Sequence, residues 1–435
     1  MRPAPTPFWN WKSQGFRSSG KVGLFATENS TSAFRNATSR ANYPPGAWDS
    51  SRPRAVVLPP GERTRKEGSP VHPGKVAIIG GGIAGTAFAQ RYRQLGGQVS
   101  IHERGGPQHH PGMGFILLAN GFEALSSVGR RSAVEKLSYP LTDCTIRDHR
   151  GNTLLDEKLE WAHGITRSAF LEALSRGLPE SWIRHGQAFS HFESNPNGRV
   201  RRAIFENGEQ VEADLFLGCD GANSRVRGEI FPTAKLSGSR VIELVSEIES
   251  DLLVARTRKR FMKFRHEEGG LALGLVPASR RKLIWYLQFD AEKYSTPEAD
   301  PGRLESFTRL LTQGWPGPVL QLIQATDFRR TRICHTGALE PLNAYFRENV
   351  ALLGDAAHAM HSFTSQGVNT AIEDAVLLAE TLANSHSSTS RHALTSYSEA
   401  RKAAIRPLLK LGNTLQDEFL APPTVDQRIP LATTA

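Results

Sequence analysis

The chain has 435 residues, of which 39% are apolar, and it carries a formal net charge of +10. This length allows two or three ordinary domains with sizeable cores. Residues 1–70 hold eleven Lys and Arg against four acidic residues, so most of the surplus lies there and no nucleic-acid-binding face is expected on the folded body. No run reaches the roughly 18 uncharged apolar residues of an integral membrane segment. Three widely separated cysteines indicate neither a disulfide framework nor a zinc site.

Residues 1–73 differ in composition from the rest, because Ser, Thr, Arg, Asn and Pro dominate and no periodicity is sustained. We expect a disordered basic extension. Its Arg-rich, acid-poor composition is also that of an organelle transit peptide, although it lacks a clear amphipathic helix. No apolar segment of the signal-peptide kind stands at the N-terminus, so we expect a cytoplasmic protein whose fold starts at about Gly74.

A glycine-rich motif opens the folded part. It comprises Gly80, Gly82, Ile83, Ala84 and Gly85, with the apolar run V-A-I-I directly before it and a helical pattern after it. In such a strand-turn-helix unit the glycines make the tight turn, let backbone amides approach a pyrophosphate and let the helix pack close to the sheet. The motif predicts a dinucleotide at the positive N-terminus of the helix; the alternative is a glycine-rich turn with no ligand.

Glu103 closes the next predicted strand, at residues 99–101. It stands roughly 20 residues after the motif, where a carboxylate accepts hydrogen bonds from the adenosine ribose hydroxyls. No Arg takes its place, so a 2′-phosphate is not expected, and we include the following residue, Arg104, among the cofactor-binding candidates. The unit by itself leaves open whether the dinucleotide is FAD or NAD.

Two hairpins are predicted in the next hundred residues. Strands at 144–148 and 153–157 flank the turn sequence H-R-G-N, and strands at 201–206 and 210–217 flank N-G. Between the hairpins, Thr166 is a suitable N-cap for a helix that has Arg167 in its first turn. The local sequence favours a surface position for Arg167 over a ligand contact.

Asp220 lies in the turn G-C-D-G at 218–221, which follows an apolar strand. Ser224 is placed to cap the next helix. An aspartate held in this way accepts hydrogen bonds from a ligand hydroxyl or from loop amides, and a structural Asx-turn is the simpler interpretation of the turn alone. Earlier in the chain, His109 and His110 lack a third ligand nearby, so a solvated loop is favoured there over a metal site.

Residues 240–290 are strand-like and predict an antiparallel sheet that covers the cofactor domain. Trp285, Tyr286 and Phe289 either line a pocket in this sheet or, as aromatic residues on strands more often do, form plain core. Residues 297–325 predict a helical region interrupted by Pro and Gly.

The chain then returns to the first domain. A buried strand at 350–353 is followed by Gly354 and Asp355, a loop of small residues and a long helix from about Gln366, with Thr364 or Ser365 as N-cap. The free amides at this helix start can stabilise negative charge on a ring system. The residues concerned are Gln366, Gly367, Val368 and Asn369.

His358 and His361 are candidate catalytic residues in the same loop, but beside Ala-Ala a structural role is favoured for both. An amphipathic helix at 397–418 and a Pro-rich tail end the chain. The sequence assigns no catalytic acid or base and no metal ligand.

Three motifs therefore stand in one order: the glycine motif with Glu103, G-C-D-G, and G-D-A-A-H followed by Q-G-V-N. Over about residues 74–410 they resemble the FAD-dependent aromatic hydroxylases, the para-hydroxybenzoate hydroxylase-like class A flavoprotein monooxygenases. The resemblance implies an α/β fold with a Rossmann-like FAD-binding domain of the GR2 type, an inserted mixed or antiparallel β-sheet substrate domain, and C-terminal helices.

The same resemblance implies roles for the site residues. The glycines and Glu103 would hold the ADP part of FAD, Asp355 the ribityl chain, and residues 366–369 the flavin ring near N1. Arg167 resembles the Arg of the family's R-x-x-L helix start, which contacts FAD. The stretch that contains Asp220 resembles the motif associated with both FAD and the pyridine nucleotide.

One departure from the family pattern G-D-A-A-H-x-x-x-P-x-x-G-Q-G concerns the loop beside the flavin. Ser362 stands at the Pro position, and Ser365 stands at the first of the paired glycines. We expect a less rigid loop and an added side chain where the backbone approaches the ring. FAD binding should survive, and the geometry for oxygen activation is the property most affected.

The resemblance further implies an order of segments along the chain. These are a basic extension (1–73), the first FAD-binding part (74–145), a substrate-domain segment with hairpins (146–210), the FAD-binding segment with Asp220 (211–235), the main substrate domain (236–340), the second FAD-binding part with the C-terminal helix (341–420) and a tail (421–435).

The implied function is hydroxylation of a small aromatic or polycyclic substrate by FAD, with NADH or NADPH as co-substrate and O2, through a flavin C4a-hydroperoxide. The alternatives are a flavin reductase or dehydrogenase of the same fold, and an FAD-binding protein without catalytic activity. We expect a small organic substrate, no nucleic acid partner, and a monomer or homodimer.

Overall fold

The computed structural model describes residues 74–106, 113–385 and 390–423. The predicted extension at 1–73, the loop with His109 and His110 and most of the predicted tail lie outside these ranges. Within them, no helix combines the length and the apolarity that crossing a membrane requires.

A six-stranded sheet forms the centre of the predicted FAD-binding domain. Its order is β16-β17-β10-β1-β2-β6, and all neighbours are parallel except β16 and β17. The inner strands are short apolar runs because a parallel sheet is buried on both faces. The strands are β1 (Val76–Ile79), β2 (Val99–Glu103), β6 (Ile183–His185), β10 (Leu215–Gly218), β16 (Phe346–Arg347) and β17 (Val350–Leu352).

Helices pack around this sheet, and the helix predicted after the glycine motif is among them. That helix, α1, packs against α10 and α4, and α10 also contacts α2 and α11. The helices of this part are α1 (Ile83–Gln94), α2 (Ala119–Ser127), α3 (Arg131–Leu137), α4 (Arg167–Ser175), α5 (Arg225–Ile230), α9 (Asp355–His358), α10 (Gly367–Ala383) and α11 (Arg391–Leu420).

A mixed eight-stranded sheet corresponds to the predicted substrate domain. Its order is β15-β11-β14-β13-β12-β4-β5-β3, and only β12 and β4 pair in parallel. The hairpin predicted around H-R-G-N is its β4–β5 pair. The strands are β3 (Gly114–Leu117), β4 (Tyr139–Asp148), β5 (Thr153–Thr166), β11 (Val241–Glu249), β12 (Arg260–Arg265), β13 (Leu271–Pro277), β14 (Lys282–Asp290) and β15 (Arg332–His335).

The two faces of this sheet have different neighbours, as the alternation along β14 shows. Trp285 and Phe289 belong to the apolar core that includes residues of α7 and α8, whereas Tyr286 points to the opposite face and borders a cavity. Both interpretations of the aromatic residues were therefore correct, each for a different residue. The remaining helices are α6 (Asp251–Thr257), α7 (Pro301–Leu311), α8 (Gly317–Gln324) and the 3-10 segments η1 (Glu180–Trp182), η2 (Phe328–Arg330) and η3 (Ser362–Thr364).

The second predicted hairpin differs from the structure in its outgoing strand. The strand expected at 210–217 is divided into β9 (Gln210–Glu212), in a three-stranded sheet, and β10, in the six-stranded sheet. The division occurs where Asp214 accepts a hydrogen bond from the Lys75 amide, at 2.7 Å, and the chain turns into register with β1. The other strands of the small sheet are β7 (Phe189–Ser194) and β8 (Val200–Phe205).

The segment predicted at 146–210 is shared between the two large cores. Its first part completes β4 and β5, but β6 pairs with β2, and Phe189 and Phe205 pack into the core of the six-stranded sheet. Conversely, β3 pairs with β5 in the eight-stranded sheet, although it falls within the predicted range 74–145. Long-range strand pairing decides these memberships, and the local pattern of a strand does not show its partner.

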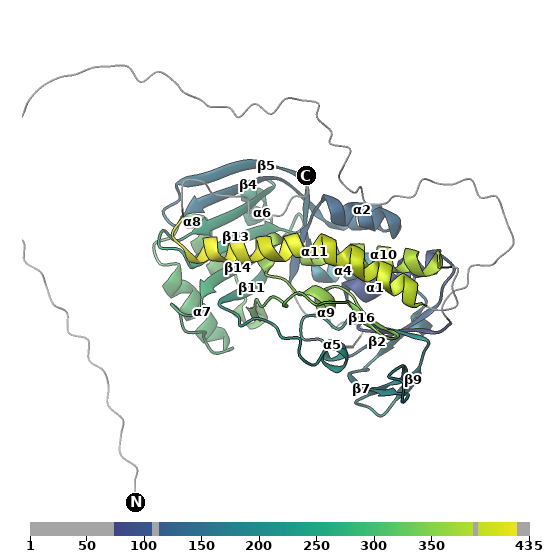
Figure 1. Ribbon diagram of the computed structural model, residues 1–435. Coiled ribbons are helices and arrows are strands. Elements are labelled where there is room, and N and C mark those ends of the chain that lie inside the picture. The colour runs from purple at the N-terminus through teal and green to yellow at the C-terminus, as the bar shows by residue number, and fades with distance from the viewer. Residues whose placement is uncertain (1–73, 107–112, 386–389, 424–435) are drawn as a thin grey trace, which may run out of the picture. The chain divides into compact units, whose positions relative to one another are not determined.

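The C-terminal helix α11 links the two large sheets. Figure 1 shows it passing from α10 and α1 towards β13 and β14. Its last turns place Leu415 and Phe419 in a small apolar cluster with Val241, Ala272 and Phe363. The end of α11 therefore packs against the eight-stranded sheet together with Phe363 of the loop after α9.

The buried His102 of β2 makes folding stability depend on pH. Its Nε2 lies 2.9 Å from Ser100 Oγ and its ring stacks on Phe205. Burial, helped by the charge of Arg184, lowers the pKa of His102 to about 4. Because the unfolded chain takes up this proton at about pH 6.5 and the folded chain does not, stability is lost as the pH falls from 6.5 to 4.

We predict that His102→Gln reduces this acid-induced loss by about 3 kcal/mol. The free energy of unfolding, measured by urea denaturation at pH 7, 6, 5 and 4, checks this. His191→Gln, which changes an exposed histidine of β7, is the control and should keep the wild-type slope. An equal loss in the wild type and in His102→Gln would show that His102 does not carry the effect.

Candidate active site

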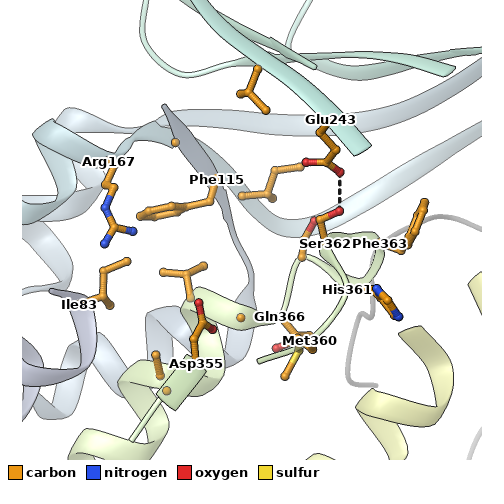
Figure 2. A pocket seen from close by; sticks show the side chains of 18 of the residues that line it. Ile83, Phe115, Arg167, Glu243, Asp355, Met360, His361, Ser362, Phe363 and Gln366 are labelled. Carbon is orange, nitrogen blue, oxygen red and sulfur yellow. Dashed lines mark hydrogen bonds between the residues drawn. The ribbon is translucent and has the colours of Figure 1, made fainter. Parts of the chain in front are cut away.

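A cavity of about 350 Å3 lies between the two large sheets. One end is formed where β1, β10 and β17 finish, which is where ligands bind in open α/β sheets. The other end is formed by the face of the eight-stranded sheet that carries Tyr286. Figure 2 shows Arg167 and Asp355 at the first end and Glu243 with Ser362 at the second.

The three motif glycines have different physical tasks in the turn between β1 and α1. Gly80 has φ +107°, and a Cβ there would lie 2.4 Å from the carbonyl oxygen of Cys219. A Cβ on Gly85 would lie 2.2 Å from the carbonyl oxygen of Gly80. For Gly82 the nearest atom is Arg167 Nη2, at 3.7 Å, so that position faces open cavity. Two glycines therefore permit the fold, and the third leaves space for a ligand.

Arg167 lines the cavity, although its local sequence favoured the surface. Thr166 caps α4 through a 3.3 Å bond from the Ala169 amide, as predicted, and this places Arg167 in the first helical turn. Burial lowers the pKa of Arg167, opposed by the charges of Asp355 and Glu103, but a guanidinium stays protonated at neutral pH. Its Nε is buried and has no hydrogen-bond partner among the residues that the structure describes, so the side chain retains a donor for a ligand.

The start of α10 presents uncapped backbone amides to the cavity. The N-cap residue is Gln366, not Thr364 or Ser365 as predicted, and within the described residues its side chain accepts no bond from the first helical turn. Thr364 Oγ1 accepts instead from the Gln366 amide, at 3.3 Å. Ser365 has φ +52° and so turns the chain in a left-handed conformation just before the helix. Gly367 and Val368 line the cavity, and the positive end of the helix dipole is therefore directed towards it.

A buried carboxylate holds this part of the cavity together. Asp374 of α10 accepts hydrogen bonds from the Gly354 amide (2.7 Å), from His358 Nε2 (2.7 Å) and from Arg401 Nε of α11 (2.5 Å). Burial alone would raise the pKa of Asp374, but these partners outweigh burial and lower it to about 2. The structural role favoured for His358 agrees with this contact, whereas His361 borders the cavity.

The structure brings most of the predicted cofactor-binding residues to the cavity. Those that line it are Gly82, Ile83, Ala84, Arg167, Gly354, Asp355, Gln366, Gly367 and Val368. Gly80, Gly85 and Asn369 are not among the residues that line the cavity. The Asn369 side chain accepts from the Leu118 amide at 3.0 Å and donates to the Ser365 carbonyl at 2.8 Å, so it braces the turn before α10.

Three further predicted residues also lie outside the cavity lining. The Glu103 carboxylate accepts from the Gly81 amide at 2.7 Å and from the Gly105 amide at 2.8 Å. Arg104 is exposed. Asp220 accepts from Ser224 Oγ at 2.5 Å and from the Arg225 and Val226 amides at the start of α5. Its contacts are structural, but they run to amides five and six residues on and so do not form the Asx-turn that was predicted. Ligand contacts for these three residues remain predictions.

The sheet end of the cavity was largely missed by the sequence analysis. Its walls are apolar, but Glu243, Lys263 and Gln288 project from strands that are otherwise mostly buried and apolar. A charged or amide residue inside such a strand is the signal that could have identified them. The residues of this end are Glu243, Val245, Phe261, Lys263, Val276, Ile284, Tyr286, Gln288, Met360, His361, Ser362 and Phe363.

The cofactor end fits FAD on three observations. Gly82 leaves open space where a dinucleotide must approach the backbone, Arg167 offers an unpaired buried donor for an anionic group, and α10 offers free amides for a ring that carries negative charge. In the described part of the chain no group of three or more His, Cys, Asp or Glu residues is arranged to hold a metal ion.

Comparison with known proteins agrees with this geometry. The model of the "FAD binding domain" family matches residues 74–411. The chain belongs to this family. Monooxygenase 1 of Arabidopsis thaliana is 25% identical over 71% of this chain and 78% of its own length. A 3-amino-4-hydroxybenzoate 2-monooxygenase of Streptomyces platensis is 26% identical over 82% of this chain and 91% of its own.

The fold agrees as well. The crystal structure of Klebsiella pneumoniae HpxO with FAD and uric acid has a TM-score of 0.73 and 22% identity, and the match covers 80% of this chain and 89% of that one. Relatives of this chain are named as monooxygenases and as FAD-dependent hydroxylases, and the chain has the flavin monooxygenase fold. The predicted family and the predicted α/β architecture are thereby confirmed.

We predict that the glycines separate FAD binding from folding. Gly82→Ala should leave the melting temperature of the FAD-free protein unchanged, because its Cβ has space, but weaken FAD binding at least about tenfold. Gly85→Ala should lower the stability of the FAD-free protein by at least ~1–3 kcal/mol, because its Cβ meets backbone. Thermal melting and flavin fluorescence titration measure the two effects, and equal behaviour of the variants would contradict the assignment.

Proposed function

We propose that this protein hydroxylates a small aromatic or polycyclic ring compound with FAD, O2 and NADH or NADPH. The observation that carries the proposal is a single cavity whose one end suits a dinucleotide and whose other end is an apolar pocket with a few polar groups. In the overall reaction one oxygen atom enters a C–H bond of the ring. The other leaves as water with the two electrons of the reduced nicotinamide.

The chain's own residues bind and orient the cofactor. Gly82 gives the diphosphate access to the backbone, Arg167 offsets anionic charge, and the carboxylate of Asp355, which lines the cavity, accepts from a polyol hydroxyl. FAD, when bound, supplies the transfer of electrons from the nicotinamide to oxygen. For Glu103, Arg104, Asp220 and Asn369, the same binding role is proposed from the motifs alone.

The first turn of α10 stabilises negative charge at the adjacent end of the ring system. Its uncapped amides and helix dipole act in a site partly closed to water, where such dipoles are worth more than in bulk solvent. Asp374 keeps this turn in place, because it joins α10 to the Gly354 amide and to Arg401. The start of α10 is thus preorganised before any ligand arrives.

The apolar walls exclude water from the reacting end. Phe115, Ile116, Phe261, Val276 and Ile284 line this space, and it suits a planar ring better than a charged chain. Two relatives, an FAD-dependent urate hydroxylase of Mycolicibacterium vanbaalenii and the 3-amino-4-hydroxybenzoate 2-monooxygenase, act by their names on ring compounds. A ring substrate for this chain is consistent with both observations.

The partners of the enzyme are accordingly a small organic molecule, O2 and a nicotinamide that binds transiently. A monomer or homodimer is proposed, because nothing in the cavity requires a residue from a second chain. The three cysteines are free thiols, and they support the cytoplasmic location expected from the sequence.

We predict that the purified flavoprotein oxidises NADH or NADPH faster when a suitable phenolic or polycyclic compound is present. Under 18O2 the product should gain one labelled oxygen atom. Coupled measurement of nicotinamide absorbance, oxygen, hydrogen peroxide and product mass tests this. Reduction without any oxygenated product across the panel would favour a reductase or dehydrogenase. A bound FAD that no nicotinamide reduces would favour a protein without this activity.

A further inference from the structure

Four polar side chains lie together on the cavity face of the eight-stranded sheet. They are Glu243, Lys263, Tyr286 and Gln288. The strand register explains why they meet. Glu243 of β11 lies opposite Gln288 of β14, and Tyr286 is two residues before Gln288 on the same face. Gly274 of β13 separates Tyr286 from Lys263, and a Cβ there would lie 2.1 Å from Tyr286 Cζ. Gly274 thus lets the Tyr286 ring lie across the strand.

Hydrogen bonds fix the Glu243 carboxylate from two sides. Gln288 Nε2 donates to Glu243 Oε1 at 2.7 Å, and Ser362 Oγ donates to the same oxygen at 2.5 Å. The second bond is the dashed line in Figure 2. Within the described part of the chain, the other oxygen, Oε2, accepts no hydrogen bond, although Glu243 is buried and borders the cavity. A carboxylate oxygen at the edge of an apolar pocket is stabilised by a hydrogen-bond donor, and a ligand in the cavity can supply one.

Lys263 is poorly placed to bind an anionic ligand. Its Nζ donates to Gln288 Oε1 at 2.7 Å and lies over the rings of Tyr286, Phe363 and Phe419, at 5.9, 5.4 and 5.6 Å from their centroids. Burial, together with the charge of Arg265, lowers the pKa of Lys263 to about 7, so its positive charge is partly lost near neutral pH. Among the described residues that line this end of the cavity, Lys263 is the only Lys or Arg, so a ligand carboxylate there would meet Glu243 with only this partly charged lysine beside it.

We propose that Glu243 determines substrate specificity by accepting a hydrogen bond from an N–H or O–H group of the ring compound. The pocket therefore selects neutral rings with a donor, such as phenols, lactams and aromatic amides, over rings that carry a carboxylate. This inference rests on the proposed function, because it names the ligand class of the same cavity. Tyr286 adds a phenol hydroxyl to the same wall, and burial raises its pKa, so the hydroxyl stays protonated.

Ser362 connects this recognition to the cofactor end. It occupies the position where the family pattern has proline, a residue without a hydroxyl to donate. Ser362 belongs to η3, which is followed directly by Ser365 and the start of α10. One hydrogen bond thus joins the loop beside the predicted flavin site to the Glu243 carboxylate, the proposed acceptor for the substrate. Ser362 is a positioning residue for Glu243.

The test measures binding to the FAD-loaded protein in the absence of any nicotinamide. Two isosteric probe pairs are used, 4-hydroxybenzamide with 4-hydroxybenzoate and 2-naphthamide with 2-naphthoate. Calorimetry and the flavin absorbance change give the dissociation constants. In the wild type, the amide should bind at least about tenfold more tightly than the carboxylate in at least one pair, a difference of ~1.4 kcal/mol.

Three variants separate the contributions. Glu243→Gln, which keeps an acceptor for Gln288 and Ser362, should remove the preference or reverse it. Ser362→Ala should reduce the preference in part, since Gln288 still holds Glu243. Glu247→Gln is the matched control, because Glu247 is a buried carboxylate on the same face of β11, paired with Lys282 at 2.8 Å and outside the cavity lining. It should keep the wild-type ratio.

A preference for the carboxylates would overturn the inference. An unchanged ratio in Glu243→Gln, or a lack of binding by either member of both pairs, would do the same. Melting temperature and FAD content verify that each variant is folded, and Ser362→Ala gives a second reading if Glu243→Gln is unstable. Because no reductant is present, the result is independent of turnover. If the protein oxygenates a substrate but binds the carboxylates more tightly, the proposed function stands and this inference is wrong. If it binds the amides more tightly but never oxygenates a substrate, this inference stands and the proposed function is wrong.

Discussion

The fully buried carboxylate of Asp374 is the interaction on which the cavity depends. Removing such a group from water costs several kcal/mol unless partners compensate it, and here an amide, a histidine and an arginine all donate to it. These donors belong to the turn after β17, to α9 and to α11. The bonds therefore hold the Gly354 turn and α10 in one arrangement, and both of them border the cavity.

The two ends of the cavity are formed by different parts of the chain, one mainly by backbone groups and the other mainly by side chains. The cofactor end consists mainly of backbone: a glycine without obstruction at Gly82, a turn at Gly80 whose positive φ suits glycine, and free amides at the start of α10. The sheet end consists of side chains on strands, where alternation directs every second residue into the pocket. A backbone site suits a cofactor common to a whole family. A side-chain site can change its chemistry by single substitutions, as Glu243 and Lys263 illustrate.

The two serines in the loop before α10 have separate consequences. Ser365 keeps the left-handed backbone that the family's glycine adopts easily, at a cost of about 1 kcal/mol for a residue with a Cβ. Ser362 instead adds a contact, because its hydroxyl reaches Glu243. Replacing the family's proline by Ser362 is expected to make the loop less rigid, but it also adds a hydrogen bond between the loop and β11. The departure from the family pattern lies where cofactor and substrate would meet.

The sequence alone determined the family, the glycine turn, the cap at Thr166 and the start of α10 to within one residue. Each of these depends on residue types at fixed local spacings, such as a glycine where the backbone must turn tightly or a Thr where a helix begins. It did not determine that residues 210–217 divide between two sheets, or that β6 joins β2, because strand partners are chosen over long distances. Arg167 illustrates the same limit, since its helix position was predicted from the local sequence and its place in the cavity lining was not. Glu243, Lys263, Gln288 and Ser362 come from four separate segments, and only the register of β11 with β14 and the packing of the loop against them bring these groups to one cavity.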